Sequence, residues 1–251
     1  FGTKEIITIE TPNNTLLAAS TPAIDSTILE DQILGTRFLT FRSESVKPLQ
    51  VMQKIDSNAQ TQSAMRKALK AQVDIYELSV EPFEYEVTDR ENKNLQLLTK
   101  QCASARTSVE LDKSKEVRNI PYTEGPGRLY HQLKRLYRAY RVIGLVEDEA
   151  IKLIRKICVD SVPPVRMKMM KWLAQQKDLV HTTSDVAKGV RMGKGHTKGH
   201  LSALYALRIV DYEEVFDETY RRFIDQWTYT GADFNLLMGM SKQVELGGDS
   251  I

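Results

Sequence analysis

The sequence predicts a mostly helical protein with a small β component. Apolar side chains recur at helical spacing through most of residues 46–176. Two further helical patterns and two alternating segments follow in residues 181–230. Near the start, IITIE alternates and TLLAAS is a continuous apolar run, as in a buried parallel strand. Strands therefore bracket a long helical middle.

The elements can be expected in order along the chain. Residues 1–42 predict strands around a turn at Pro12, a short helix STILEDQILG closed by Gly35, and a strand RFLTFR. Helical spacing then marks VKPLQVMQKI, AMRKALKAQVDIYELSV and NKNLQLLTKQCASARTSVEL, with an extended EPFEYEVTD before the last. KSKEVRNIPYTEGPG reads as a loop. Helices are expected over 127–145, 147–160 and 165–176.

The segment from His181 to Tyr212 has the pattern of a winged helix-turn-helix. A short helix begins near Thr183, a turn follows at Gly193 and Gly195, and a second helix leads into extended residues. RIVDYEEVF and TYRRFIDQW are expected to pair as the wing hairpin. Basic and imidazole side chains on the two helices predict contact with nucleic-acid phosphates: Lys188, Arg191, Lys194, His196, Lys198 and His200.

The charge distribution supports a polyanion-facing region in the middle of the chain. Residues 128–208 carry 17 Lys and Arg against 6 Asp and Glu, a net charge of +11. The residues before them have a net charge of −3 and those after them −6. The acidic stretch from Glu213 to Glu218 argues against a wing that lies on DNA.

Composition excludes several protein classes. No apolar run approaches the length of a membrane span, so no membrane partner is expected. The two cysteines, Cys102 and Cys158, cannot form a disulfide framework, which favours a reducing cytoplasm. The first ten residues lack the basic and apolar regions of a signal peptide.

The order of parts in residues 1–208 resembles the second half of a ring-forming ATPase of the AAA+ class. It is most similar to minichromosome-maintenance-type helicases and related phage or mobile-element replication helicases. The stretches that carry the resemblance are FGTKEIITIETPNN, TLLAASTPAID, GTRFLTF and GPGRLYHQLKRL. The resemblance implies residues 1–45 as the end of an AAA+ core, 46–145 as a helical lid, 146–230 as the winged helix and 231–251 as a polar tail.

The same resemblance implies candidate roles for single residues. Ser20 or Thr21 would end the sensor-1 strand beside the γ-phosphate, and Arg128 would be the sensor-2 arginine of the lid. Arg37 would act as an arginine finger on a neighbouring subunit's nucleotide, since its forked charge suits the transition-state oxygens. Lys4 would face DNA in the pore. The implied cofactors are ATP and Mg²⁺, and the implied assembly is a homo-oligomeric ring.

This chain departs from that family in one respect. It contains no G-x-x-x-x-G-K-[ST] phosphate loop, and GVRMGKGHT has the wrong spacing for one. The chain cannot by itself present a complete phosphate cradle. Its assignment as an enzyme therefore depends on residues outside this sequence.

Plainer interpretations stand beside these. Arg37 and Arg128 could be ordinary surface arginines, and Ser20 and Thr21 could simply end a strand. His196 and His200 are four residues apart on a helix, but no third ligand is near, so no metal site is predicted. The tyrosines of 127–145 are expected to pack in the core, and its basic side chains could be a solvated face.

The leading hypothesis is part of an ATP-dependent DNA helicase whose winged helix binds DNA. The alternatives are a non-enzymatic DNA-binding regulator and a winged helix that binds proteins.

Overall fold

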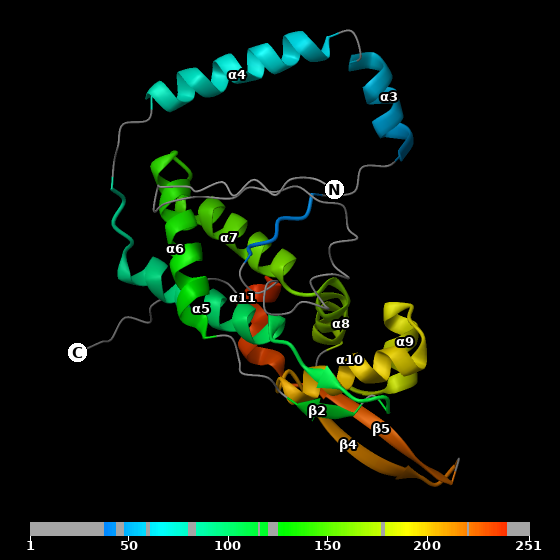
Figure 1. Ribbon diagram of the computed structural model, residues 1–251. Coiled ribbons are helices and arrows are strands. Elements are labelled where there is room, and N and C mark those ends of the chain that lie inside the picture. The colour runs from blue at the N-terminus through cyan, green and yellow to red at the C-terminus, as the bar shows by residue number, and fades with distance from the viewer. Residues whose placement is uncertain are drawn as a thin grey trace, which may run out of the picture.

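The computed structural model describes residues 38–43, 48–58, 61–79, 84–114, 116–119, 125–176, 179–219 and 221–239. Within these ranges the protein is mostly helical with a small sheet component. Figure 1 shows three parts: an arm of two helices, a helical body, and a C-terminal part built on a small sheet. None of the described helices combines the length and apolar character that crossing a membrane requires.

The helical body is built on α5 (Asp89–Arg106), α6 (Pro126–Val142) and α7 (Glu147–Ser161), which pack on one another. On α6, Leu129, Leu133 and Tyr137 recur every four residues and are fully buried. They share one core with fully buried side chains of the neighbouring helices, among them Leu95, Leu98, Cys102, Ile154 and Cys158. Removal of this apolar surface from water stabilises the body.

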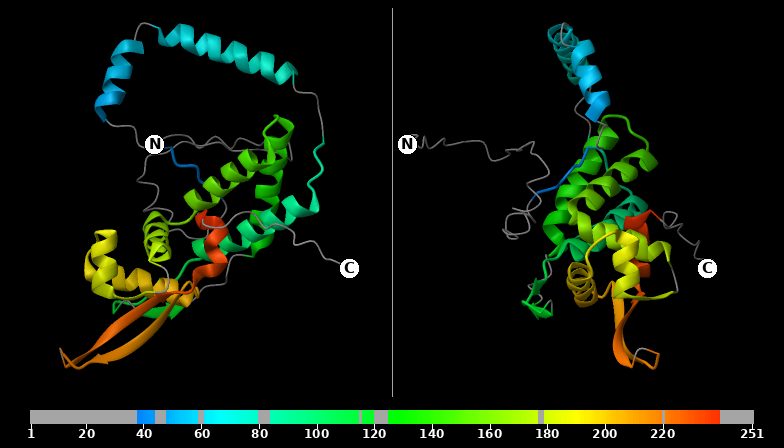
Figure 2. Two further views of the ribbon diagram at one scale, coloured as in Figure 1. Left: turned by 180° about the vertical axis from the view of Figure 1, so that it is seen from behind. Right: turned by 90° about the vertical axis from the view of Figure 1, so that its right-hand side faces the viewer.

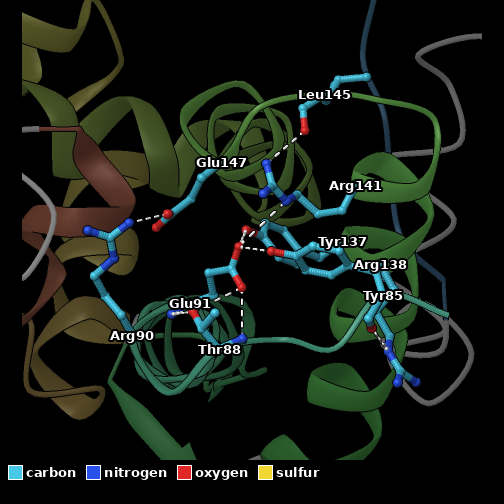
Figure 3. A network of polar contacts seen from close by, with 9 residues as sticks. All are labelled: Tyr85, Thr88, Arg90, Glu91, Tyr137, Arg138, Arg141, Leu145 and Glu147. Atoms are coloured by element: carbon cyan, nitrogen blue, oxygen red, sulfur yellow. Dashed lines mark hydrogen bonds and ion pairs between the residues drawn. The ribbon is translucent and has the colours of Figure 1, made fainter.

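Figure 3 shows a polar network that joins α5 to α6. The Glu91 carboxylate, which is almost completely buried, accepts hydrogen bonds from Tyr85 Oη (2.7 Å) and Tyr137 Oη (2.5 Å). Its other oxygen accepts from the backbone N–H of Thr88 (2.8 Å) and from Thr88 Oγ1 (3.0 Å), forming a capping box. Arg141 Nε lies 3.5 Å from the first oxygen. One buried carboxylate thus fixes the start of α5 against α6.

A buried arginine attaches the next helix, α8 (Pro164–Gln175), to the end of α5. Arg166 Nη1 donates to the backbone carbonyls of Ala105 (2.6 Å) and Thr107 (2.7 Å). A cation at a helix C-terminus satisfies carbonyls that have no partner within the helix. Burial lowers the pKa of Arg166 to about 10.

The C-terminal part contains β3 (Val180–Thr182), α9 (Thr183–Val190), α10 (Lys194–Ala206), β4 (Val210–Asp217) and β5 (Arg222–Tyr229). The strands form an antiparallel sheet of order β3-β5-β4, and β4 pairs with β5 along its whole length, from Val210↔Tyr229 to Asp217↔Arg222. The short helices η1 (Gly231–Phe234) and α11 (Asn235–Met238) follow β5. The backbone N–H of Leu237 donates to Gln101 Oε1 (2.7 Å), which returns the chain to α5.

The arm consists of α3 (Pro48–Asn58) and α4 (Gln62–Ser79), and it stands away from the body in all three views (Figures 1 and 2). Every side chain described on the two helices is exposed. Tyr76 Oη donates to the Ile143 carbonyl (2.7 Å), which links the C-terminal half of α4 to the turn after α6. The arm therefore has almost no core of its own.

Several sequence expectations are confirmed, and three are wrong. The predicted helices 127–145, 147–160 and 165–176 are α6, α7 and α8. The helix expected to run through SVEL ends at Arg106, because Arg166 binds the last carbonyls; Glu110–Leu111 instead form β1. β1 pairs with β2 (Val117–Asn119), inside the segment expected to be a loop.

The expected strand RFLTFR is also wrong over its described residues, which have no regular structure. They run along α7 instead. Asp160 Oδ2 accepts from the backbone N–H of Arg42 (2.7 Å), and Ser161 Oγ accepts from that of Thr40 (3.0 Å). Lys156 Nζ donates to the Arg42 carbonyl (2.8 Å). Side chains of α7 thus satisfy backbone groups that a neighbouring strand was expected to satisfy. The expectations for residues 1–37 and 240–251 lie outside the described residues.

Candidate nucleic-acid interface

The candidate interface begins at the first turn of α9. Thr182 is the N-cap: its Oγ1 accepts from the backbone N–H of Asp185, and the Asp185 carboxylate accepts from the backbone N–H (3.0 Å) and Oγ1 (2.7 Å) of Thr182. These hydrogen bonds hold the pKa of Asp185 below its usual value. The one acid of this helix is thus occupied at its N-terminus, where the helix dipole favours it.

A tight turn carries the chain from α9 to α10. Arg191 has a φ of 54°, the left-handed conformation that commonly ends a helix. Gly193 is the N-cap of α10 and offers no side-chain hydrogen bond to the first backbone N–H groups of that helix. The first backbone N–H groups of α10 are therefore exposed and electropositive. Lys188 in the last turn of α9 and Lys194 in the first turn of α10 add positive charge at the same turn.

The predicted phosphate contacts fall into two sets. Lys188, Arg191, Lys194 and His196 are exposed around the turn between α9 and α10. Lys198 and His200 are half-buried one and two turns further along α10. The structure thus brings the first four to one exposed region, whereas Lys198 and His200 are partly covered.

Lys198 is held by an acid that the sequence did not single out. Its Nζ lies 3.2 Å from Asp225 Oδ2 on β5. The same carboxylate accepts from Tyr212 Oη (3.1 Å) and from Thr183 Oγ1 (3.3 Å), while Trp227 Nε1 donates to Thr183 Oγ1 (2.9 Å). Burial, and then Asp225, raise the pKa of Tyr212 to about 12. Lys198 thus holds α10 to the hairpin through an ion pair. This contact could be predicted only if the register of the hairpin were known.

The two histidines on α10 lie against each other. Their Nε2 atoms are 3.2 Å apart and their rings are edge to face at 4.7 Å between centroids. Among the described residues, no group of three or more His, Cys, Asp or Glu is placed to hold a metal ion. The pair is compatible with one imidazole donating to the other.

The hairpin of β4 and β5 carries the opposite charge. Five acids lie on β4 and the turn after it: Asp211, Glu213, Glu214, Asp217 and Glu218. Phe216 and Phe223 face each other across the strands near the tip and are 48 % and 63 % exposed. Two arginines, Arg221 and Arg222, lie at the tip, but the acids outnumber them, so the hairpin as a whole is repelled by phosphates and is a poor DNA contact.

Most of the residues implied by the ATPase resemblance lie outside the described part of the chain. Lys4, Ser20, Thr21 and Arg37 lie outside the described residues. Arg128 is exposed in the first turn of α6, after Gly125 and Pro126.

The basic face expected on α6 is partly used within the protein. Arg138 Nε donates to the Tyr85 carbonyl (2.9 Å), and Arg141 Nη1 donates to that of Leu145 (2.8 Å). The expected burial of the α6 tyrosines is confirmed, since Tyr137 is fully buried and Tyr130 and Tyr140 are partly so.

Comparison of the chain with protein-family models, with curated proteins and with solved structures found no match.

Proposed function

We propose that residues 164–229 form a winged-helix module that binds DNA through backbone phosphates. Two observations support the winged-helix assignment: the order α8, β3, α9, α10, β4, β5 along the chain, and the antiparallel sheet order β3-β5-β4. The observation that carries the proposal is the exposed cationic region of Lys188, Arg191 and Lys194 around the α9–α10 turn, whose nearest acid in sequence, Asp185, is bound to its own helix cap.

The binding mode follows from the charges. Lysine and arginine neutralise phosphates and release counterions, which gives affinity without sequence selection. The acidic hairpin would point away from the duplex, so the start of α10 supplies most of the contact. This module would belong to an ATP-driven replication helicase, a context that rests on the resemblance of residues 1–208. ATP, Mg²⁺, the ring and the roles of Ser20, Thr21, Arg37 and Arg128 belong to that part of the proposal.

A protein-binding module is the second candidate. The acidic hairpin with two exposed phenylalanines favours it, because such a surface suits a basic, apolar partner better than DNA. A non-enzymatic regulator that binds DNA would share the same α9–α10 contacts.

Replacing Lys194 with Ala should weaken binding to a short duplex of any sequence by roughly tenfold, about 1.4 kcal/mol. The dependence of log K on log salt should become shallower by roughly one unit, because one phosphate contact is lost. Lys188→Ala should behave alike. Lys198→Ala should cost less, since Asp225 already holds that ammonium group. Fluorescence anisotropy at several salt concentrations measures both quantities.

Lys93→Ala is the matched control, because Lys93 is exposed on α5 and its loss changes the net charge equally. If Lys194→Ala and Lys93→Ala leave the same affinity and salt slope, the α9–α10 region does not contact phosphates. The protein-binding candidate would then replace the DNA-binding one.

A further inference from the structure

Two exposed apolar surfaces of opposite charge lie at opposite ends of the molecule. One is on α4, at the end of the molecule formed by the arm; the other is near the tip of the β4–β5 hairpin. All three views place them far apart (Figures 1 and 2). A single chain therefore cannot bring them together, but two chains can.

The surface on α4 is basic and apolar. Met65 and Leu69 are one turn apart and 52 % and 66 % exposed. Arg66 and Lys70 are the next residues along the helix in each turn, so they border the apolar pair on one side. Neither forms a hydrogen bond or ion pair with another described residue. The first half of α4 contains no acid, and its first acid is Asp74.

An 18-residue helix with all its described side chains exposed also needs a partner. Most helical stability in proteins comes from packing an apolar face against other elements. Within the described chain, a hydrogen bond from Tyr76 to the Ile143 carbonyl ties the C-terminal half of α4 to the turn after α6. The apolar face of its N-terminal half is left to be covered by something else.

The surface on the hairpin is apolar and lies on a segment of net negative charge: residues 210–229 hold six acids against two arginines, Arg221 and Arg222, which lie at the tip. Phe216 and Phe223 oppose each other with ring centroids 5.2 Å apart. Glu214 lies two residues before Phe216 and so projects from the same face of β4, whereas Glu213 projects from the other face. The Glu214 carboxylate is exposed and pairs with no cation among the described residues.

We propose that α4 of one copy of this chain docks on the β4–β5 hairpin of a second copy. Met65 and Leu69 would pack on the two phenylalanine rings, and Arg66 and Lys70 would approach Glu214. The contact joins different surfaces, so each copy keeps one free surface of each kind, and the assembly grows head to tail into a ring or a filament. The contact is independent of the DNA proposal, because it uses none of the α9–α10 residues.

The proposed interface between the two copies is small, so its affinity should be low. Four large apolar side chains and a few charges lie below the area of a stable protein complex, so association depends on protein concentration. Opposite charges speed encounter and exclude like-charged partners, and salt screens them. The complex should weaken as salt rises without being abolished, since the apolar contacts persist.

The test is sedimentation velocity on the whole chain with two complementary variants. Arg66→Glu/Lys70→Glu disables α4, and Glu214→Gln/Phe223→Ser disables the hairpin without adding a cation that would attract the reversed α4. The unchanged chain should form species larger than a dimer as its concentration rises. Each variant alone should remain monomeric, and an equal mixture should stop at a dimer, because only one intact pair of surfaces remains.

Matched controls reverse charges on the opposite faces of the same two elements. Lys67→Glu lies two residues from Met65, about 200° around α4, and Glu213→Lys lies on the other face of β4. Both should associate like the unchanged chain, and all variants should keep its circular-dichroism spectrum.

Three results would overturn the proposal. The unchanged chain could be monomeric up to about 1 mM, the weak limit of specific binding. The hairpin variant alone could still dimerise, which would mean that α4 pairs with α4. The mixture of the two variants could fail to associate. Any of these leaves the DNA proposal standing, because Lys194→Ala tests that separately.

Discussion

Replacing Gly189 with Ala should destabilise the protein by about 3 kcal/mol, at the upper end of the usual cost of overpacking. Gly189 lies in the last turn of α9, where the indole ring of Trp172 on α8 rests against its backbone. A Cβ built on Gly189 would lie 2.1 Å from Trp172 Cε2 and 2.3 Å from Nε1. The indole is rigid and partly enclosed, also meeting the His181 ring edge to face, so it cannot move aside at low cost.

The loss would appear as a lower midpoint in urea unfolding with an unchanged slope. Gly195→Ala is the matched control, because a Cβ there meets no atom within 4 Å. Gly195 lies in the first turn of α10, where alanine should add about 0.5–1 kcal/mol by restricting the unfolded chain.

A second variant separates the close contact from a general preference for glycine. Trp172→Leu removes the ring, so Gly189→Ala should cost much less in that background. An equal cost in both backgrounds would show that Trp172 is not the obstacle. The clash should also displace α9 relative to α8, and DNA affinity should fall with stability because Lys188 and Arg191 lie at the same end of α9.

The role of Gly189 marks the limit of what the sequence could predict. The helices of residues 126–206 and the hairpin follow from local patterns: apolar residues every three to four positions, prolines at the first turns of α6 and α8, and alternation in β4 and β5. In the sequence, Gly189 begins the stretch GVRMGKGHT, whose spacing excludes a phosphate loop and predicts no other role for this glycine. It is glycine because an indole from another helix occupies the space of its side chain.

The same limit applies to the candidate interface. The cationic residues around the turn could be named from the sequence, because their exposure follows from the helical pattern that buries Val186 and Val190. The ion pair between Lys198 and Asp225 could not be predicted from the sequence, because it depends on the strand register that sets Glu214 opposite Asp225. Contacts between residues far apart in sequence also determine where α5 ends and how the residues before α3 run along α7.

Replacing Glu91 with Gln should destabilise the protein by about 3–4 kcal/mol at pH 7, close to the cost of breaking a buried ion pair. The group facing Glu91 consists of donors: two tyrosine hydroxyls, the N–H and hydroxyl of Thr88, and the Arg141 guanidinium. A carboxylate accepts from all of them, whereas a glutamine amide must point two N–H groups at some of them. The Thr88 N–H or the Arg141 charge would then lose its acceptor.

The effect should depend on pH in a defined direction. Burial alone would raise the pKa of Glu91, but the hydrogen bonds from Tyr137, Tyr85 and Thr88 outweigh it and hold the pKa below its usual value of 4.5. The folded state therefore favours the ionised form. This contribution is fully present above about pH 4.5 and is lost as the pH falls through the lower pKa of the folded state.

The free energy of unfolding of the unchanged chain and of Glu91→Gln should therefore differ most near neutral pH and converge as the solution is acidified. Urea unfolding at a series of pH values measures the difference directly. Glu86→Gln is the control, because Glu86 is exposed in the same segment and should change stability by less than about 0.5 kcal/mol. A gap between Glu91→Gln and the unchanged chain that stays constant with pH would mean that shape, and not the carboxylate charge, joins α5 to α6. A gap that widens on acidification would contradict the direction of the pKa shift itself.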